Sequence, residues 1–356
     1  MQNVKVAIWG FGAMGSGMAE MLLNKEGVDI VGVCVSRPER AGKKMSEVLG
    51  KPLNGKAEVI LTNNLDEAVK EGECDVVLVC TDSHAPSVTE KVIRVLEKKV
   101  NCITIAEEMA YTQAQYPELA KKIDECAKKN GVSALGTGIN PGLMMDLLAV
   151  CFSGCMIDVK SVACKRVNSL SPFGATVMRE QGVGTTVEQF AAGKADGSLT
   201  GHIGFAESIM MISDAIGLKV EKIEEQMDPI VTDVDRKTPN GAGAAKAGDV
   251  AGVSMRAQGL RDGKNVIDMQ HPQQIEPEQV GVQTGDYITI EGTPAVHMAN
   301  TPEIDGGLGT IAMAVNCIPQ CINAEPGLRS MIDIPVPHAI MDDFRNHVYE
   351  SKKLVK

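Results

Sequence analysis

The chain has 356 residues, 44% of them apolar, and its 46 acidic against 35 basic residues give a net charge of −11. At about 150 residues per domain this length predicts two domains, and the apolar content excludes a disordered chain. An acidic chain is a poor ligand for phosphate backbones, so we expect no nucleic-acid partner. No apolar run approaches the roughly 20 residues of a membrane span, and no signal-peptide pattern precedes the first strand-like run, so we expect a cytoplasmic protein without a membrane partner.

The first 140 residues alternate between strand-like and helical patterns. Strands are predicted at Val4–Trp9, Val28–Val35, Ala57–Thr62, Asp75–Cys80, Asn101–Ile105 and Val132–Leu135. Helices are predicted at Ser16–Asn24, Asn64–Glu71, Pro86–Lys98 and Pro117–Asn130. This order predicts an α/β fold, with a doubly wound parallel sheet of the Rossmann type over residues 1–140.

The pattern changes after residue 140, where strands outnumber helices. Strands are predicted at Val159–Val167, Val220–Val231, Gly248–Leu260, Asn265–His271 and Tyr287–Glu291, and helices at Leu143–Val150, Thr186–Ala195 and Phe205–Ile216. We therefore expect a second, α+β domain with a mixed or antiparallel sheet over residues 141–305. A helical pattern resumes at Gly306, which predicts that residues 306–356 form a helical segment packing back on the first domain.

The ten cysteines of this chain predict reduced thiols rather than a disulfide framework. Cys34, Cys80 and Cys102 stand in apolar strand-like runs, where cysteine packs as a small hydrophobe. A zinc site would need CxxC pairs or nearby histidines, and the sequence has neither, so we expect no metal.

A glycine-rich motif follows the first predicted strand and opens the first helix. It comprises Gly10, Phe11, Gly12, Ala13, Met14 and Gly15, which fit GxGxxG. Gly10 permits a tight turn, Gly12 lets the backbone approach a pyrophosphate, and Gly15 lets the helix pack closely on the strand. The motif predicts a dinucleotide site, and an ordinary glycine-rich turn is the alternative.

The end of the second strand distinguishes between the two nicotinamide dinucleotides. NAD sites place a carboxylate there for the ribose hydroxyls, whereas this chain has Ser36, Arg37 and Arg40. These residues suit a 2′-phosphate, and Glu39 is close enough in sequence to serve a ribose. We predict that NADP is accepted and that NAD is an alternative, so the expected cofactor is NAD(P). Two solvated arginines on a loop are the other interpretation.

Two further strand ends carry polar residues. Thr81, Ser83 and His84 follow the fourth predicted strand and should border the nicotinamide ribose. Glu107 and Glu108 follow the next strand, and because adjacent side chains point apart, one of them is expected to enter a pocket. A carboxylate there could accept a proton from an ammonium substrate. The alternative is that both complement the dipole of a helix start.

The boundary between the two predicted domains supplies the remaining candidates. Asn140 begins an Asn-Pro-Gly entry whose backbone N–H groups could hold a carboxylate, or which serves as a hinge. Arg166 and Asn168 alternate on a strand and share one face, and arginine suits a bidentate carboxylate. His202 comes shortly before a helix, where a purely structural histidine is the alternative.

Four segments together, GFGAMG, AEEM, GTGINPGLMMD and KRVN, resemble the 2,4-diaminopentanoate dehydrogenase family over nearly the whole chain. That family is related to native amine dehydrogenases and, more distantly, to dihydrodipicolinate reductases. The resemblance implies oxidative deamination of (2R,4S)-2,4-diaminopentanoate at C4, as in ornithine fermentation, to 2-amino-4-oxopentanoate, ammonia and NAD(P)H. It also implies that the second domain binds the diamino-acid substrate and forms the interface of a homodimer or higher homo-oligomer.

The resemblance also places individual residues. The catalytic carboxylate falls in AEEM, best at Glu108, and Glu107 stays open because a one-residue slip exchanges them. Residues of the substrate pocket fall on Asn140, Arg166, Asn168, His202 and Thr310.

Two departures from related families bear on the reaction. The chain has no His-His pair of the dihydrodipicolinate reductase type, and Glu108 stands where related sugar dehydrogenases carry a lysine. A carboxylate in that place favours an amine over an alcohol. A cyclic-imine reductase and a non-catalytic NADP(H)-binding protein are the alternatives.

Overall fold

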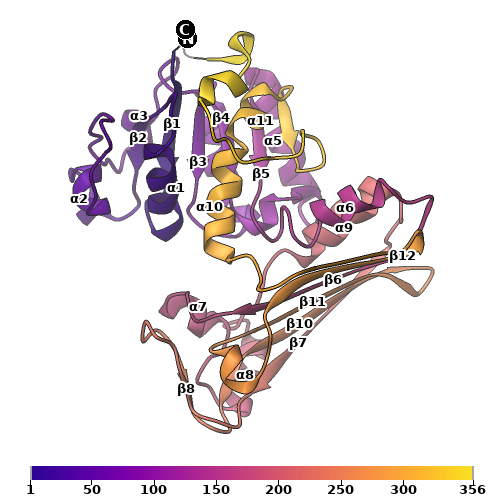
Figure 1. Ribbon diagram of the computed structural model, residues 1–356. Helices are drawn as coiled ribbons and strands as arrows, with labels where there is room; N and C mark the ends of the chain where they lie inside the picture. The colour runs from indigo at the N-terminus through magenta and orange to yellow at the C-terminus, as the bar shows by residue number, and fades with distance from the viewer. Residues whose placement is uncertain (1, 355–356) are drawn as a thin grey trace. The chain divides into compact units, whose positions relative to one another are not determined.

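The computed structural model describes residues 2–354 and divides into two units (Figure 1). The first unit comprises the chain up to Leu143 and again from Gly306 onward, and the second runs from Met144 to Asp305. Each unit contains one six-stranded sheet.

All strands of the first sheet are parallel, in the order β14-β5-β4-β3-β1-β2. They are β1 (Val4–Trp9), β2 (Val28–Cys34), β3 (Val76–Val79), β4 (Asn101–Thr104), β5 (Ser133–Gly136) and β14 (Gly327–Arg329). Every residue of β3 and β4 is buried, as expected of strands covered on both faces. The order reverses between β1 and β3, where a doubly wound sheet binds its ligand, so the predicted α/β fold is confirmed.

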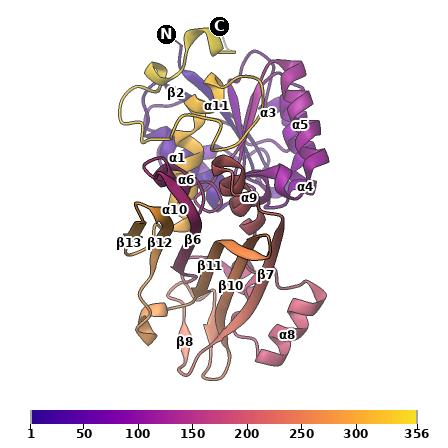
Figure 2. The same ribbon diagram turned by 90° about the vertical axis from the view of Figure 1, so that its right-hand side faces the viewer.

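Helices cover both faces of this sheet. In Figure 2, α4 and α5 lie on one side of it and α1 and α10 on the other. The helices of this unit are α1 (Ala13–Leu23), α2 (Met45–Leu49), α3 (Leu65–Ala68), α4 (Ala85–Leu96), α5 (Pro117–Asn130), α10 (Gly306–Asn316) and α11 (Ile318–Asn323). The amphipathic pattern that predicted α4 places Val88, Val92 and Val95 on one face of the helix, and this face is buried against the sheet.

Two features of the first unit differ from the prediction. The strand predicted at Ala57–Thr62 is wrong: this segment makes only two isolated bridges, Lys44 with Ile60 and Cys34 with Thr62. It pairs first with one loop and then with the end of β2, so no continuous ladder forms. The tail beyond Gly306 is also not purely helical, because it contributes β14 to the edge of the sheet beside β5.

The second unit has a mixed sheet in the order β13-β12-β6-β11-β10-β7, which confirms the predicted α+β class. Only β6 and β11 pair in parallel. The strands are β6 (Asp158–Ser169), β7 (Lys222–Val231), β10 (Val250–Arg261), β11 (Lys264–Gln274), β12 (Gly285–Thr293) and β13 (Val296–Asn300), and a small separate pair is β8 (Arg236–Lys237) with β9 (Ala244–Ala245). The helices are α6 (Leu147–Ser153), α7 (Ala175–Glu180), α8 (Val187–Asp196) and α9 (Phe205–Ile216).

One face of this mixed sheet is apolar and carries α6 and α9. Cys164 of β6 lies in register with Met269 of β11 and Ile288 of β12, and all three are buried in one core with Ile209 of α9. Since alternate residues of a strand share a face, Arg166 of β6 continues this row beyond the apolar part.

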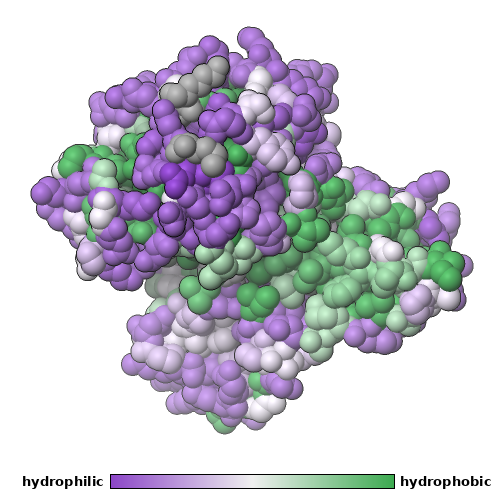
Figure 3. Space-filling view, turned by 45° about the horizontal axis from the view of Figure 1, so that its top comes forward, coloured by the Kyte–Doolittle hydropathy of each residue, from purple (hydrophilic) through white to green (hydrophobic). Residues whose placement is uncertain are grey.

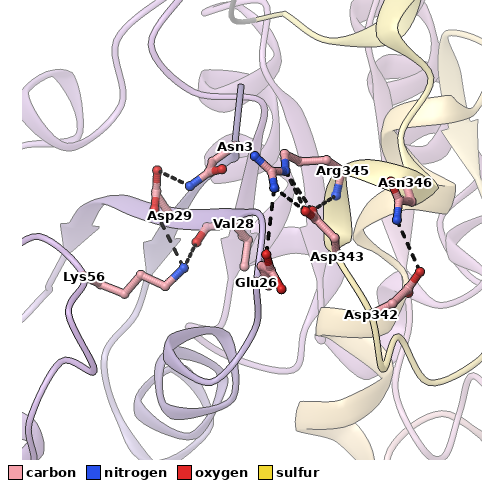
Figure 4. A network of polar contacts seen from close by, with 9 residues as sticks. All are labelled: Asn3, Glu26, Val28, Asp29, Lys56, Asp342, Asp343, Arg345 and Asn346. Carbon is pink, nitrogen blue, oxygen red and sulfur yellow. Dashed lines mark hydrogen bonds and ion pairs between the residues drawn. The ribbon is translucent and has the colours of Figure 1, made fainter. Parts of the chain in front are cut away.

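Polar contacts just before β2 tie the C-terminal segment to the rest of the first unit (Figure 4). Arg345 binds Asp343 and lies 4.0 Å from the carboxylate of Glu26. At the start of β2, Lys56 approaches Asp29 to 3.9 Å and donates a 2.6 Å hydrogen bond to the Val28 carbonyl. The contact of Arg345 with Glu26 holds the tail beside the start of β2, at the edge of the sheet opposite the ligand-binding ends of the strands.

The second unit exposes apolar residues at its surface. In Figure 3 hydrophobic residues spread over one side of the second unit, and Ile157, just after α6, is 88% exposed.

Among residues 2–354 no helix is long and apolar enough to cross a membrane. The same residues contain no group of three histidine, cysteine or acidic side chains placed to hold a metal ion, and all ten cysteines are free thiols.

Candidate active site

The glycine-rich motif forms the turn between β1 and α1. A Cβ at Gly10 would lie 2.4 Å from the Cys80 carbonyl oxygen, and one at Gly15 would lie 1.9 Å from the Gly10 carbonyl oxygen. Gly12 differs, because a Cβ there would meet no protein atom within 4 Å. Gly10 and Gly15 are therefore required by the fold. At Gly12 and the exposed Ala13, by contrast, the amino end of α1 is accessible to a ligand.

The arginines after β2 lie beside this turn. Ser36 and Arg37 are exposed, and the Nη1 atom of Arg40 donates a hydrogen bond to the Phe11 carbonyl oxygen. Arg40 therefore contacts the glycine-rich turn itself. The one acidic residue of this stretch, Glu39, is exposed on the short 3₁₀ helix Pro38–Arg40.

The loop after β3 is a compact hydrogen-bonded cluster. Lys91 of α4 donates to Thr81 Oγ1 at 2.9 Å and to Asp82 Oδ2 at 2.6 Å. His84 is the residue before α4, and its backbone N–H donates to Asp82 Oδ1 at 3.3 Å. The backbone carbonyl of Ser83 accepts from the Glu108 N–H at 3.2 Å, which joins this loop to the end of β4.

The two adjacent glutamates differ in their surroundings. Glu108 is 6% exposed, and its Oε2 accepts a 2.7 Å hydrogen bond from the backbone N–H of Ala85, the first residue of α4. Its Oε1 has longer contacts, 3.4 Å to His84 Nδ1 and 3.5 Å to the Tyr116 hydroxyl. Burial raises the pKa of the half-buried Glu107, and a hydrogen bond from Ser83 opposes that shift. Both carboxylates thus lie at the ligand-binding edge of the sheet.

The crossover after β5 brings Asn140 close to α10. The backbone N–H of Ile139 donates to Thr310 Oγ1 at 3.4 Å. Gly142 has φ of +131°, and a Cβ there would lie 2.5 Å from the Gly138 backbone, so only glycine fits this turn. The structure therefore places Asn140 and Thr310, two of the candidates that the family resemblance supplied, in neighbouring segments of the first unit.

The second unit gathers the buried Arg166 and Asn168 and the half-buried His202 in one polar cluster. Arg166 is 2% exposed and forms an ion pair with Asp286, and its Nη2 donates to the Ile304 carbonyl. His202 donates its backbone N–H to the Met255 sulfur at 2.8 Å.

The sequence alone did not reveal His271 and Asp286, which complete this cluster. His271 Nε2 lies 2.9 Å from Asn168 Oδ1, and its ring lies edge-on to that of His202, with centroids 4.5 Å apart. Burial lowers the pKa of His202 to about 3 and that of His271 well below its usual value, and the Arg166 charge acts in the same direction. Both rings are therefore neutral at physiological pH. Only the pairing of β6 with β11 and β12 brings these residues together.

Comparison with known proteins identifies the family. Residues 143–350 match the model of the 2,4-diaminopentanoate dehydrogenase C-terminal domain, and residues 10–134 match the NAD binding domain of homoserine dehydrogenase. The chain is 57% identical to the 2,4-diaminopentanoate dehydrogenase of Acetoanaerobium sticklandii, with 100% of both proteins covered. The chain belongs to the 2,4-diaminopentanoate dehydrogenase family.

A more distant relative and a solved structure are both amine dehydrogenases. The chain is 21% identical to an amine dehydrogenase of Streptomyces virginiae, over 95% of this chain and 98% of that protein. The structure of an amine dehydrogenase from Mycobacterium smegmatis matches it with a TM-score of 0.84 at 24% identity, over 96% of this chain and 98% of that one, which shows a common fold. The resemblance, the NAD(P) cofactor class and the prediction of an oxidoreductase acting on CH–NH2 groups are confirmed.

The open approach to Gly12 fits the pyrophosphate of this cofactor and leads to a prediction. We expect Gly12→Ala to fold normally but to bind NADPH about 10- to 100-fold more weakly, since the methyl group displaces a charge-assisted hydrogen bond. Gly15→Ala, the matched change, should instead lower the melting temperature. Thermal denaturation and NADPH titration, followed by the emission of Trp9, the single tryptophan, separate the two effects. Unchanged NADPH affinity in Gly12→Ala would place the pyrophosphate elsewhere.

Proposed function

We propose that the chain catalyses the NAD(P)-dependent oxidative deamination of (2R,4S)-2,4-diaminopentanoate at C4, yielding 2-amino-4-oxopentanoate and ammonia, a step of ornithine fermentation. The observation that carries the proposal is the buried Glu108 carboxylate at the end of β4 in the NAD-binding unit. The close relative from Acetoanaerobium sticklandii supports the choice of substrate.

We assign the proton-accepting role to Glu108 rather than Glu107. The Ala85 N–H fixes one oxygen of Glu108 at 2.7 Å, while the contacts of the other, 3.4 and 3.5 Å, are long. That second oxygen can therefore accept a shorter, charge-assisted bond from an ammonium group. The Glu107 side chain is instead hydrogen-bonded to Ser83, in the loop after β3.

The reaction then uses Glu108 twice. It first takes a proton from the C4 ammonium group, leaving a free amine. When bound, NAD(P)+ supplies the acceptor for the hydride of C4. Glu108 next takes a proton from the water that adds to the resulting iminium carbon and returns it to the nitrogen. As the C–N bond breaks, the hydroxyl proton of the adduct passes to the departing ammonia, so the ketone and an ammonium ion are released.

The polar cluster of the second unit supports recognition of the amino-acid end of the substrate. Two of the five guanidinium N–H groups of Arg166 bind Asp286 and Ile304, which leaves donors for a carboxylate. The neutral ring of His271 has a buried Nδ1 without a hydrogen-bond partner, which can accept from an ammonium group. A simple amine would leave such groups unpaired, so we expect the enzyme to discriminate strongly in favour of the diamino acid.

The arginines beside the glycine-rich turn support a preference for NADP+. We expect Arg37→Ala to lower kcat/KM for NADP+ about 10- to 100-fold, the effect of losing one charge-assisted hydrogen bond to the 2′-phosphate. The kcat/KM for NAD+, which lacks this phosphate, should stay within about twofold of its original level. Initial rates with each cofactor at fixed substrate test this, and equal losses for both cofactors would contradict the assignment.

The function itself is tested by measuring ammonia release and NAD(P)H formation with a panel of diamino acids, simple amines and cyclic imines. We expect one ammonia per NAD(P)H with 2,4-diaminopentanoate and little turnover of simple amines. Reduction of a cyclic imine without amine oxidation would establish a reductase instead. Binding of NADPH without turnover of any compound would indicate a non-catalytic protein.

We also propose that the enzyme is a cytoplasmic homodimer or higher homo-oligomer. The apolar surface of the second unit supports self-association, because monomers rarely expose large apolar areas (Figure 3). The ten free cysteines support a reducing compartment.

A further inference from the structure

His84 lies beside the carboxylate that the proposed reaction uses. Its Nδ1 is 3.4 Å from Glu108 Oε1, and its side chain is 52% exposed whereas that of Glu108 is 8% exposed. The ring therefore connects a buried acid to solvent. Its backbone is held in place because it precedes α4 and donates its N–H to Asp82.

The stoichiometry of the reaction requires such a connection. An ammonium substrate, NAD(P)+ and water give a ketone, an ammonium ion, NAD(P)H and one proton. That proton is the first one that Glu108 accepts. Since Glu108 must act as a base again when water adds, it has to release this proton to solvent before the second step.

We propose that His84 relays this proton, an inference that rests on the proposed function. The neutral ring accepts the proton from Glu108 Oε1 at Nδ1, and its Nε2–H then passes a proton to bulk water. An N–H bond forms at Nδ1 as the O–H bond of Glu108 breaks. The ring then loses its Nε2 proton to water and returns to the tautomer that carries a proton on Nε2, which completes the cycle. His84 thus acts through Glu108 as a positioning and relay residue.

The charged groups around His84 are consistent with this role. Asp82 is neutralised by Lys91 at 2.6 Å, so Glu107 and Glu108 are the carboxylates left facing the ring. Tyr116 also contacts Glu108 Oε1, at 3.5 Å, but its hydroxyl donates to that oxygen. A phenol that already donates cannot accept the proton without first giving up its own.

The test is rapid-mixing kinetics of His84→Ala with 2,4-diaminopentanoate at saturating NADP+. We expect one NADPH per active site to form at a rate close to the original, followed by a steady state about 100-fold slower, the low end for a proton-transfer group. Added imidazole should restore the steady-state rate in proportion to its concentration. His297→Ala, which removes an exposed histidine on β13, should show neither the slow phase nor the rescue.

Three outcomes would overturn the relay: an unchanged steady-state rate, a slow first turnover, or a slow phase that imidazole does not restore. A rescuable slow phase in Tyr116→Phe instead would assign the relay to that residue.

Failure of the proposed function is distinguishable, because in that case the unmodified protein itself would not turn over 2,4-diaminopentanoate. Weakened cofactor binding would raise KM for NADP+ and would not respond to imidazole. His84→Gln, which retains a side chain of similar length, provides a second variant if His84→Ala does not fold.

Discussion

Glu108→Gln is expected to lower kcat for 2,4-diaminopentanoate by about 10²- to 10⁴-fold, the range that a positioned acid–base group contributes. Glutamine keeps the size of the side chain, and its amide oxygen can still accept the hydrogen bond from the Ala85 N–H. It cannot take a proton from the C4 ammonium group at physiological pH. The loss should therefore appear in the first turnover as well as in the steady state.

The matched control is Glu107→Gln, which removes the neighbouring carboxylate from the same 3₁₀ helix. We expect a much smaller loss of kcat from this change. NADPH affinity, measured through Trp9 emission, should be retained in both variants, since neither carboxylate belongs to the glycine-rich turn. A larger loss in Glu107→Gln than in Glu108→Gln would exchange the two roles.

Asp286→Asn is expected to destabilise the second unit by about 3–5 kcal/mol, the cost of leaving a buried charge without its partner. Arg166 and Asp286 are each 2% exposed, and Asp286 Oδ2 also accepts from the Ile304 N–H at 2.9 Å. The pair therefore connects β6 and β12 to the chain just before α10. Urea denaturation followed by circular dichroism measures the change in the free energy of unfolding.

An exposed ion pair of the same unit provides the comparison. Lys222 and Glu224 lie 2.7 Å apart on β7, with side chains 68% and 50% exposed. Glu224→Gln should change the free energy of unfolding by no more than about 1 kcal/mol, because solvent screens such pairs. Equal effects of the two substitutions would show that Arg166 is solvated or has another partner.

Local patterns were sufficient to predict the elements whose stability depends on their own sequence. The predicted bounds of Val4–Trp9, Pro117–Asn130 and Phe205–Ile216 agree with β1, α5 and α9. In α5 a proline at the first position and Gly131, with φ of +70°, after the last residue mark both ends. Such signals act within one turn of the helix and do not depend on the rest of the fold.

Long-range pairing determined what the sequence did not reveal. The three residues of β14 become a strand only through pairing with β5, almost 200 positions earlier. The segment Ala57–Thr62 has strand-like composition, but it contacts two different partners and forms no ladder. Strand propensity is a property of the segment alone and does not indicate which strand will pair with it. Neither the strand β14 nor the missing ladder at Ala57–Thr62 could therefore be predicted from local sequence.

The candidate site divides in the same way. The glycine-rich turn and the Glu107–Glu108 pair were visible because each is a short motif at a strand end. The contact of Glu108 with His84, and that of Asn168 with His271, joins residues 24 and 103 positions apart, which only the folded sheets reveal. The catalytic and substrate-binding roles of these residues remain predictions.

The most direct measurement is a crystal structure of the Glu108→Gln variant with NADP+ and 2,4-diaminopentanoate bound. We expect the side chain at position 108 to lie within hydrogen-bond distance, about 2.6–3.2 Å, of the C4 nitrogen. A C4 nitrogen that contacts a different proton acceptor, with residue 108 turned away from it, would show that Glu108 is not the base of the reaction.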